Sequence, residues 1–170
     1  MKHKIEYLDA AEIGDIEAIT EQLIRVNRCA AVVKGGRRFS FAALTVTGNR
    51  DGMVGYGFGK ARQVPGAIEK ASKDGRKHMM HVPRTAWGSI PHEVVGEYCA
   101  ARVILIPASE GTGIIAGTSV RAVAEMAGIK NLLSKAYGST NPVNMVKATL
   151  DALSQLRTYE TVASLRGVQL

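Results

Sequence analysis

Apolar-rich runs separated by glycine-containing turns between positions 25 and 59 predict an antiparallel sheet. The runs 25–33, 39–47 and 53–59 are rich in β-branched and aromatic residues, which favour strands. The first two runs are separated by Lys34-Gly35-Gly36-Arg37, whose glycine pair can supply the positive backbone angles of a tight hairpin turn. A second turn is expected at 48–52, where glycine stands at both ends, so the three strands follow one another as hairpins.

A helical pattern follows from Pro65 to about Met80, with proline in the first turn, where it is well tolerated. Its expected inner stripe consists of Val64, Ile68, Ala71, Gly75 and Met79. A different side carries Lys70, Lys73 and Lys77, which steps of three and four residues keep within about 60° of one another. The strands and this helix form a predicted β-β-β-α unit.

Strands and helices alternate in the second half of the chain, which is typical of a small α/β layer. We expect strands at 94–95, 100–106 and 131–137, and helices at 118–127 and from Asn141-Pro142 onward. The last helix has a clear apolar stripe made of Val143, Val146, Leu150, Leu153 and Leu156. Residues 109–117 are expected to be a flexible link, with Thr118 or Ser119 capping the next helix and Gly128 ending it.

The predicted fold class is α+β with two domains, which suits a chain of 170 residues. The expected divisions are an N-terminal extension over 1–22, a first domain over 23–84, a second domain over 85–157 and a tail over 158–170. Residues 5–23 have loosely helical apolar spacing, which indicates a weak helix or an extension that orders on a partner. We expect the tail to be loosely ordered.

The net charge of +7 is distributed unevenly along the chain. Residues 1–24 have two basic and six acidic residues, residues 25–84 have thirteen and three, and residues 85–170 have seven and six. The middle segment therefore has a net charge of +10, and a polyanion is the commonest partner of such a surface. A merely well-solvated face is the alternative. The drop in charge after residue 84 also supports a domain boundary there.

No apolar run approaches the ~18 residues that a membrane helix needs, and the N-terminus lacks an apolar stretch of the signal-peptide type. We therefore expect a cytoplasmic protein without a membrane partner. In that compartment Cys29 and Cys99 are expected to be free thiols in the core.

The glycine-rich segments do not match nucleotide-binding loops. A P-loop needs glycine at Val54 and a hydroxyl at Ala61, and neither is present. Residues 111–117 follow an apolar strand, but their glycine spacing is one residue too long for the dinucleotide fingerprint. The histidines lack further ligands at zinc spacing, and no nucleophile elbow or acid–base pair stands out. We therefore expect no cofactor, no metal, no small-molecule substrate and no enzymatic activity.

Basic residues of the first domain stand on three kinds of element. They are Lys34, Arg37 and Arg38 at the hairpin tip, Lys60 and Arg62 at the end of the third strand, and Lys70, Lys73 and Lys77 on the helix face. Charges so placed can reach several phosphates along a backbone, as in folds that recognise double-stranded RNA by shape. Few aromatic residues are available for base stacking, so recognition of the backbone is favoured over sequence reading.

The third predicted strand has side chains on one face only. Val54, Tyr56 and Phe58 share that face, and the opposite face consists of Gly55, Gly57 and Gly59. A strand face without side chains admits another backbone closely, and both RNA and the domain's own helix fit this description. We favour RNA for at least part of the face.

Four motifs follow one another along the chain. They are V-N-R-x-x-x-x-V-K-G-G-R-x-F-S-F-x-A-L-T-V, G-Y-G-F-G-K-A-R-x-V-P, P-A-S-E-G-T-G-I-I-A-G and K-A-Y-G-S-T-N-P-V-N. In this order they resemble the family of the fifth protein of the bacterial small ribosomal subunit. The resemblance covers roughly Leu23 to Leu156, and the segments 6–21 and 84–98 match the family's pattern weakly.

The resemblance implies a first domain with a double-stranded-RNA-binding-like fold, a second α/β domain, and a structural role on small-subunit ribosomal RNA. It also implies contacts with the fourth and eighth proteins of the small subunit, and support of subunit assembly and translational accuracy. The alternative is a non-ribosomal RNA-binding chaperone or regulatory module.

Charge placement and the resemblance together give two sets of expected site residues. The RNA-binding set consists of Arg28, Lys34, Gly35, Gly36, Arg37, Arg38, Gly57, Gly59, Lys60, Arg62, Lys70, Lys73 and Lys77. The protein-partner set consists of Glu110, Gly111, Gly113, Gly117 and Arg121, where the resemblance places the contact with the fourth protein. The expected location is cytoplasmic and ribosome-bound.

Overall fold

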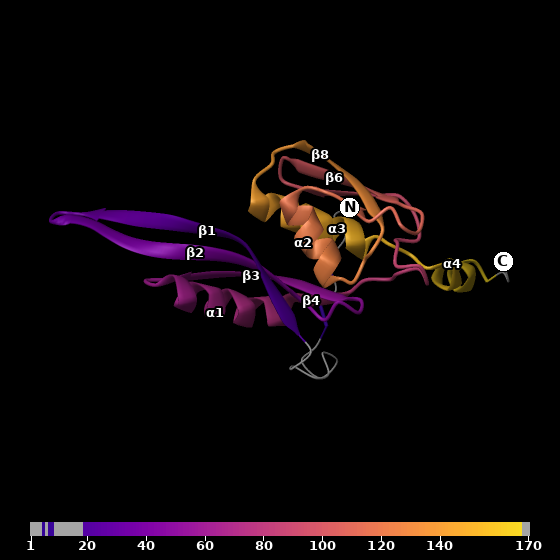
Figure 1. The fold of residues 1–170 in the computed structure, drawn as a ribbon, viewed down its shortest axis with the longest axis horizontal. Coiled ribbons are helices and arrows are strands. Elements are labelled where there is room, and N and C mark those ends of the chain that lie inside the picture. Colours follow the sequence, from indigo (N-terminus) through magenta and orange to yellow (C-terminus); the bar gives the residue numbers. More distant parts are fainter. Residues whose placement is uncertain (1–4, 6, 9–18, 168–170) are drawn as a thin grey trace.

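The computed structural model describes residues 5, 7–8 and 19–167, which form two four-stranded sheets with helices (Figure 1). The first sheet has the strand order β1-β2-β3-β4, and every neighbouring pair is antiparallel. Its elements are β1 (Thr20–Val33), β2 (Gly36–Gly48), β3 (Met53–Ala61), α1 (Val64–Gly75) and β4 (Met79–His81). The α+β class and the β-β-β-α order are confirmed, with β4 as an additional strand.

The first two strands are longer than their sequence patterns predict. Residues 20–23, expected to be part of a weak helix or extension, are the beginning of β1; residues 9–18 of that segment lie outside the described residues. A register shift between Leu23 and Arg25 marks a bulge in β1. From there the pairing of β1 with β2 continues without interruption to Val33 and Gly36.

Helix α1 covers the glycine face of β3. A Cβ atom added to Gly57 would lie 1.8 Å from the carbonyl oxygen of Ala71, and one added to Gly59 would lie 2.3 Å from that of Ala67. Both glycines are buried. The expectation that RNA contacts Gly57 and Gly59 is therefore wrong, because the backbone of the domain's own helix already occupies this face.

The same close approach decides which side of α1 faces the sheet. The buried residues of α1 are Ala67, Ala71, Ser72 and Gly75. The larger Val64 and Ile68 of the expected inner stripe are only half-buried. Small side chains lie inside because a helix backbone in contact with a strand backbone leaves no room for larger ones. The predicted stripe was thus right for Ala71 and Gly75 and wrong for Val64 and Ile68 as its most buried members.

Helix α1 ends at Gly75, earlier than the expected end near Met80. A short 3-10 turn, η2 (Arg76–His78), leads into β4. There Met79 pairs with Gly55 and is fully buried. The sequence pattern missed β4 because a strand of three residues is too short to show alternation.

The second sheet has the order β5-β6-β8-β7, with β7 parallel to β8 and the other pairs antiparallel. The elements of this half are β5 (Val94–Tyr98), β6 (Ala101–Pro107), β7 (Ile114–Ile115), α2 (Thr118–Met126), β8 (Leu132–Gly138), α3 (Pro142–Ser154) and α4 (Tyr159–Arg166). The expected α/β layer is confirmed. Strand β7 lies in the segment expected to be a flexible link, and α4 lies in the tail expected to be loosely ordered, so both expectations are wrong there.

The apolar stripe predicted for α3 is confirmed. Val146, Leu150 and Leu153 are almost fully buried. The Asn141 side chain accepts a hydrogen bond from the amide of Val143 and so caps the start of the helix. Local sequence signals were sufficient here, because the cap and the stripe both lie within the helix itself.

The C-terminal end of α2 is capped by the first domain. The carbonyl groups of Met126 and Ala127 accept hydrogen bonds from the backbone amides of Arg50 and Gly52, at 3.0 and 3.1 Å. These amides belong to the turn between β2 and β3, so carbonyls that a helix end leaves unpaired find donors in the other domain. Gly128 follows the helix with φ of 76°, as expected for a terminating glycine.

The N-terminal end of α2 has no side-chain cap. Gly117 occupies the capping position, so the expectation that Thr118 or Ser119 would cap the helix is wrong.

One apolar core joins the two sheets. The face of the first sheet opposite α1 presents Leu44, Val46 and Val54, which belong to the same buried cluster as Val120 and Val123 of α2. The first sheet is therefore covered by α1 on one face and by the second domain on the other (Figure 1). The expected domain divisions stay a prediction, since this core is continuous across residue 84.

Cys29 and Cys99 are free thiols, as expected, but neither lies in the core. Cys29 is half-exposed on β1, and Cys99 is exposed in the β5–β6 turn with φ of 53°. Within the described part of the chain, no helix is long and apolar enough to cross a membrane.

Replacing Gly57 by alanine is expected to destabilise the protein by about 1–3 kcal/mol, because the new Cβ must displace the carbonyl group of Ala71. The matched control is Gly66→Ala, a helical position at which the added Cβ would meet Ala61 at an ordinary 3.6 Å. This control should stabilise the protein by about 0.5–1 kcal/mol. Urea unfolding gives both free energies, and a Gly57→Ala protein as stable as the original would contradict the close approach.

Candidate nucleic-acid interface

The ends of β1 and β2 extend beyond the rest of the sheet as a two-stranded hairpin. The last residue of β2 that pairs with β3 is Phe41, opposite Ala61. Beyond it the strands pair only with each other, and we call residues 28–40 the projecting hairpin (Figure 1). The extended chain from Phe41 to Gly35 spans about 20 Å. Because these strands pair only with each other, the arm gains little stability from the core. A two-stranded ribbon of this kind is only marginally stable in water.

The tip of the projecting hairpin is cationic. Lys34, Arg37 and Arg38 are exposed, and no ion pair among the described residues involves them. Gly36 has φ of 141°, which suits glycine, and a Cβ added to Gly35 would meet no atom within 4 Å. The turn therefore presents both charge and open backbone to the surroundings.

The two faces of the projecting hairpin differ in chemistry. Cross-strand partners share a face, and the pair Val26–Ala43 packs toward α1, which fixes the identity of both faces. The face on the α1 side carries Arg28, Ala30, Val32, Arg37 and Phe39. The opposite face carries Cys29, Ala31, Arg38 and Ser40. On the α1 side, the guanidinium carbon of Arg28 lies 3.7 Å from the centroid of the Phe39 ring.

Lys60 and Arg62 lie at the base of the projecting hairpin. Lys60 is exposed on β3 opposite Ala42, on the face away from α1. Arg62 directly follows β3 and is exposed just before α1 begins. Arg62 therefore continues the charge of the tip toward the helix, whereas Lys60 adds charge to the opposite face of the sheet.

The lysines of the helix extend this charge further. Lys70 and Lys73 are exposed on α1, whereas Lys77 lies past the end of α1 in η2. Lys73 donates a hydrogen bond of 2.7 Å to the Glu69 carboxylate, and this bond lowers the pKa of Glu69 below its ordinary value. Lys73 is therefore partly neutralised by its own helix, whereas Lys70 and Lys77 form no ion pair among the described residues.

The predicted cations are spread along the length of the first domain and not gathered in a compact patch, with Arg38 and Lys60 on the sheet face away from α1. Helix α1 starts near the hairpin base and runs away from it, since Ala67 faces Gly59 and Gly75 faces Gly55. Its twelve residues add about 18 Å to the ~20 Å of the hairpin. We name this surface the cationic strip, which consists of Arg28, Lys34, Arg37, Arg38, Lys60, Arg62, Lys70, Lys73 and Lys77. Its length matches an extended polyanion better than a small anion.

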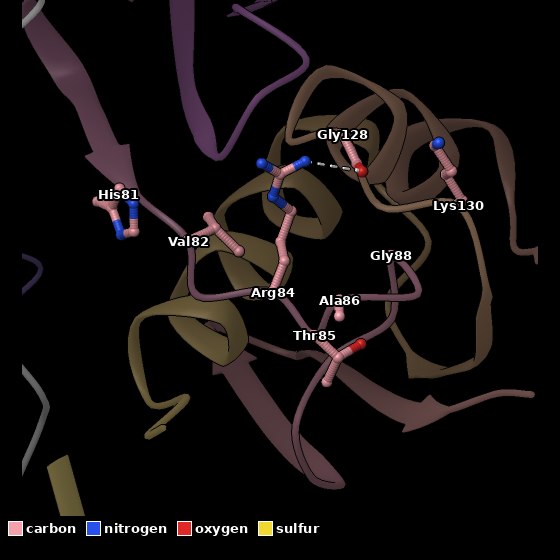
Figure 2. A pocket seen from close by; sticks show the side chains of 8 residues that line it. All are labelled: His81, Val82, Arg84, Thr85, Ala86, Gly88, Gly128 and Lys130. Atoms are coloured by element: carbon pink, nitrogen blue, oxygen red, sulfur yellow. Dashed lines mark hydrogen bonds between the residues drawn. The ribbon is translucent and has the colours of Figure 1, made fainter. Parts of the chain in front are cut away.

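A second basic region lies at the domain junction, where the sequence predicted no site. A pocket of about 410 Å³ lies there, and His81, Arg84 and Lys130 are among the lining residues that Figure 2 shows. Its central cation is already engaged, because Arg84 donates to the carbonyl of Gly128 at 3.3 Å and pairs with the Asp51 carboxylate. Arg84 therefore acts as a structural link. It had no sequence signal, since its partners are 44 and 33 residues away.

Lys147 of α3 is another basic residue that the fold engages internally. Its ammonium nitrogen lies 4.7 Å from the Tyr98 ring centroid and 5.5 Å from that of Tyr56, and it donates to the Tyr98 hydroxyl at 3.1 Å. Burial alone would lower the pKa of Lys147, but the hydrogen bond to Tyr98 and the charge interactions with both tyrosines raise it overall. Tyr56 is on β3, so this contact also joins the domains.

The predicted protein-partner set gathers around β7 in the second domain. Glu110 and Gly111 are exposed in the loop after β6, and Gly111 and Gly113 have φ of 86° and 74°. Arg121 of α2 donates a hydrogen bond of 2.8 Å to the carbonyl of Ile114, so its side chain supports the loop. The set is thus one loop with the start of α2, on a different domain from the cationic strip.

Two domain families match the chain. Residues 19–83 match the family described as ribosomal protein S5, N-terminal domain, and residues 96–166 match ribosomal protein S5, C-terminal domain. The small ribosomal subunit protein uS5 of Rhodopirellula baltica is 59% identical over 157 residues, which cover 92% of this chain and 88% of that protein. The proteins of the same name from Blochmanniella floridana and Shewanella oneidensis are both 52% identical, and the matches cover 94% and 96% of this chain and 90% and 95% of theirs.

The fold and these matches define a structural protein of the small ribosomal subunit that binds ribosomal RNA and is not an enzyme. The predicted class of function and the ribosome-bound location are confirmed. More particularly, the chain belongs to the ribosomal protein S5 family.

Rates of amide hydrogen exchange are expected to differ between the projecting hairpin and the centre of the sheet. The cross-strand amides of the projecting hairpin should exchange orders of magnitude faster than those of residues 44–47, which lie in the buried centre of β2. Exchange measured by mass spectrometry on the free protein checks this. Equal protection of both segments would mean that other parts of the chain hold the hairpin in place.

Proposed function

We propose that this protein binds small-subunit ribosomal RNA through the cationic strip, with the projecting hairpin as its leading contact. The observation that supports this most directly is an arm about 20 Å long with an exposed cationic tip and little support from the core. Gly35 and Gly36 belong to the proposed contact because they leave the turn backbone open. Gly57 and Gly59 do not belong to it, since α1 covers them.

The proposed mode of recognition is neutralisation of phosphates along an extended path. The strip is about 40 Å long from the hairpin tip to Lys77, and such a length spans several phosphates of a structured RNA. The tip and base cations form no ion pairs among the described residues, so they can meet phosphates without first breaking internal bonds. Affinity should therefore come mainly from counterion release.

The arm also explains a role in subunit assembly, which we include in the proposal. The hairpin receives little stability from the core, so RNA contacts on both of its faces would hold it in one position. Binding would then fix the position of nearby RNA segments relative to the rigid two-sheet body. A contribution to translational accuracy follows if the fixed RNA belongs to the decoding region.

We further propose that the loop Glu110–Gly117 and Arg121 contact the fourth protein of the small subunit. The loop is exposed, yet its shape is held by the Arg121 bond to Ile114 and by a bond from the Gly113 amide to Asn131. A loop whose shape is already fixed loses little conformational entropy on binding, which suits a protein contact. The eighth protein is proposed as a second neighbour, and the cytoplasm as the location.

The first test of RNA binding is its salt dependence. If six cations of the strip each meet a phosphate, the logarithm of the binding constant should fall against the logarithm of salt concentration with a slope of about −4 to −5. Filter binding of the full chain to a small-subunit ribosomal RNA transcript measures this slope. An affinity that barely changes with salt would refute phosphate neutralisation.

The second test is the double variant Lys34→Glu with Arg37→Glu, which should weaken RNA binding at least about tenfold. The matched control, Arg157→Glu with Arg166→Glu, changes the net charge equally at exposed positions of the second half of the chain. Both proteins should unfold at the same temperature as the original, because neither pair contributes to the core. Equal binding by both double variants would show that net charge, and not the hairpin tip, decides affinity.

The third test concerns the partner loop. Glu110→Lys is expected to reduce chemical crosslinks between the 110–117 loop and the fourth protein in reconstituted small subunits, because it reverses an exposed charge without touching the core. Glu160→Lys on α4 is the matched control, since Glu160 is also exposed. Unchanged crosslinking in Glu110→Lys would remove this loop from the proposed contact.

A further inference from the structure

An aromatic ring is exposed on the projecting hairpin in direct contact with a guanidinium group. Phe39 is 42% exposed, and its cross-strand partner Ala30 is too small to cover it. The guanidinium carbon of Arg28 lies 3.7 Å from the ring centroid, so the two planar groups form a stack on the α1 side of the hairpin. Val32, 80% exposed, lies on the same face nearer the tip.

Phosphate neutralisation accounts for the charge of this face but not for its apolar area. The ring of Phe41, nearer the base, packs against the small core cluster under α1. Helix α1 begins only at Val64, after the end of β3, so it leaves Phe39 uncovered.

We propose that the Arg28–Phe39 stack binds an unpaired nucleobase of the RNA. Nucleobases stack on aromatic rings and on the planes of arginine side chains, and each such contact contributes substantially to binding single-stranded segments. Arg28 also places a positive charge beside the base, where the phosphate of the same nucleotide lies. This inference rests on the proposed function and adds to it a preference for RNA with unpaired nucleotides.

The charge of the hairpin favours a nucleobase over an apolar protein side chain as the occupant. No acidic residue stands between Glu21 and Asp51, whereas this segment contains Arg25, Arg28, Lys34, Arg37, Arg38 and Arg50. Arg37 is on the same face as the stack, two residues nearer the tip than Phe39. A base on the stack would thus lie among cations that hold its own backbone and that of its neighbours.

The experiment compares two RNA probes of nearly equal charge. One is a fully paired duplex, and the other is the same duplex with a bulge of unpaired adenosines, one replaced by the fluorescent analogue 2-aminopurine. The variants are Arg28→Lys, which keeps the charge without the planar group, and Phe39→Leu, which keeps apolar bulk without the ring. Matched controls on the other sheet face are Arg25→Lys and Phe58→Leu, since Arg25 is exposed and Phe58 is 47% exposed.

We expect each variant to lose about tenfold in affinity for the bulged RNA. Phe39→Leu should leave binding of the paired duplex unchanged, and Arg28→Lys, which keeps the charge of the strip, should lose clearly less on the duplex than on the bulged RNA. The original protein and both controls should quench the 2-aminopurine fluorescence on binding, whereas Phe39→Leu should not. Equal losses on both probes would assign Arg28 to phosphate contacts alone and overturn the inference. No loss on either probe would also overturn it, and would leave the exposed ring to a protein neighbour.

The double variant Lys34→Glu with Arg37→Glu separates this inference from the proposed function. If that variant binds both probes as well as the original protein does, the proposed RNA surface itself is wrong. If it binds both weakly while Arg28→Lys and Phe39→Leu behave as the original, only the base-stacking site is wrong. Circular dichroism of all variants confirms that the fold is intact.

Discussion

The contact between the backbones of α1 and β3 is the constraint on which the rest of the structure depends. Glycines at 55, 57 and 59 leave that strand face without side chains, and the small residues of α1 pack directly against it. With α1 on this face, the opposite face of the sheet packs against α2, and one core extends into the second domain. Because α1 begins only after Ala61, the outer ends of β1 and β2 have no helix beneath them. The hairpin therefore projects beyond the rest of the sheet because α1 starts only at its base.

This arrangement divides the molecule into a rigid body and a charged arm. The body is held together by the shared core and by bonds across the junction, including those from Arg50 and Gly52 to the end of α2. Basic residues near the junction are used internally: Arg84 bonds to Gly128 and Asp51, and Lys147 contacts two tyrosines. The cations of the arm form no ion pairs among the described residues. Free positive charge is thus concentrated on the paired strands that extend beyond the rest of the sheet, where phosphates can reach it.

Local patterns in the sequence predicted the elements well and their environment less well. The longer strands, the start and stripe of α3 and the cationic hairpin tip were visible, because each depends on neighbouring residues only. The occupant of the glycine face was not, since Gly57 and Ala71 are far apart in sequence and meet only through the fold. Strand β4 was too short to show a pattern, and the bonds of Arg84 join residues far apart in sequence. The Arg28–Phe39 stack depends on strand register, which the turn alone did not fix.

The central claim is that the projecting hairpin is the leading RNA contact of this S5-family protein. Ultraviolet crosslinking of intact small subunits, with the crosslinked peptides identified by mass spectrometry, tests it most directly. RNA crosslinks are expected to concentrate in residues 28–40, with further crosslinks at Lys60 and Arg62 and none at the buried Gly57 and Gly59. Crosslinks confined to the second domain, with the hairpin unmodified, would contradict it.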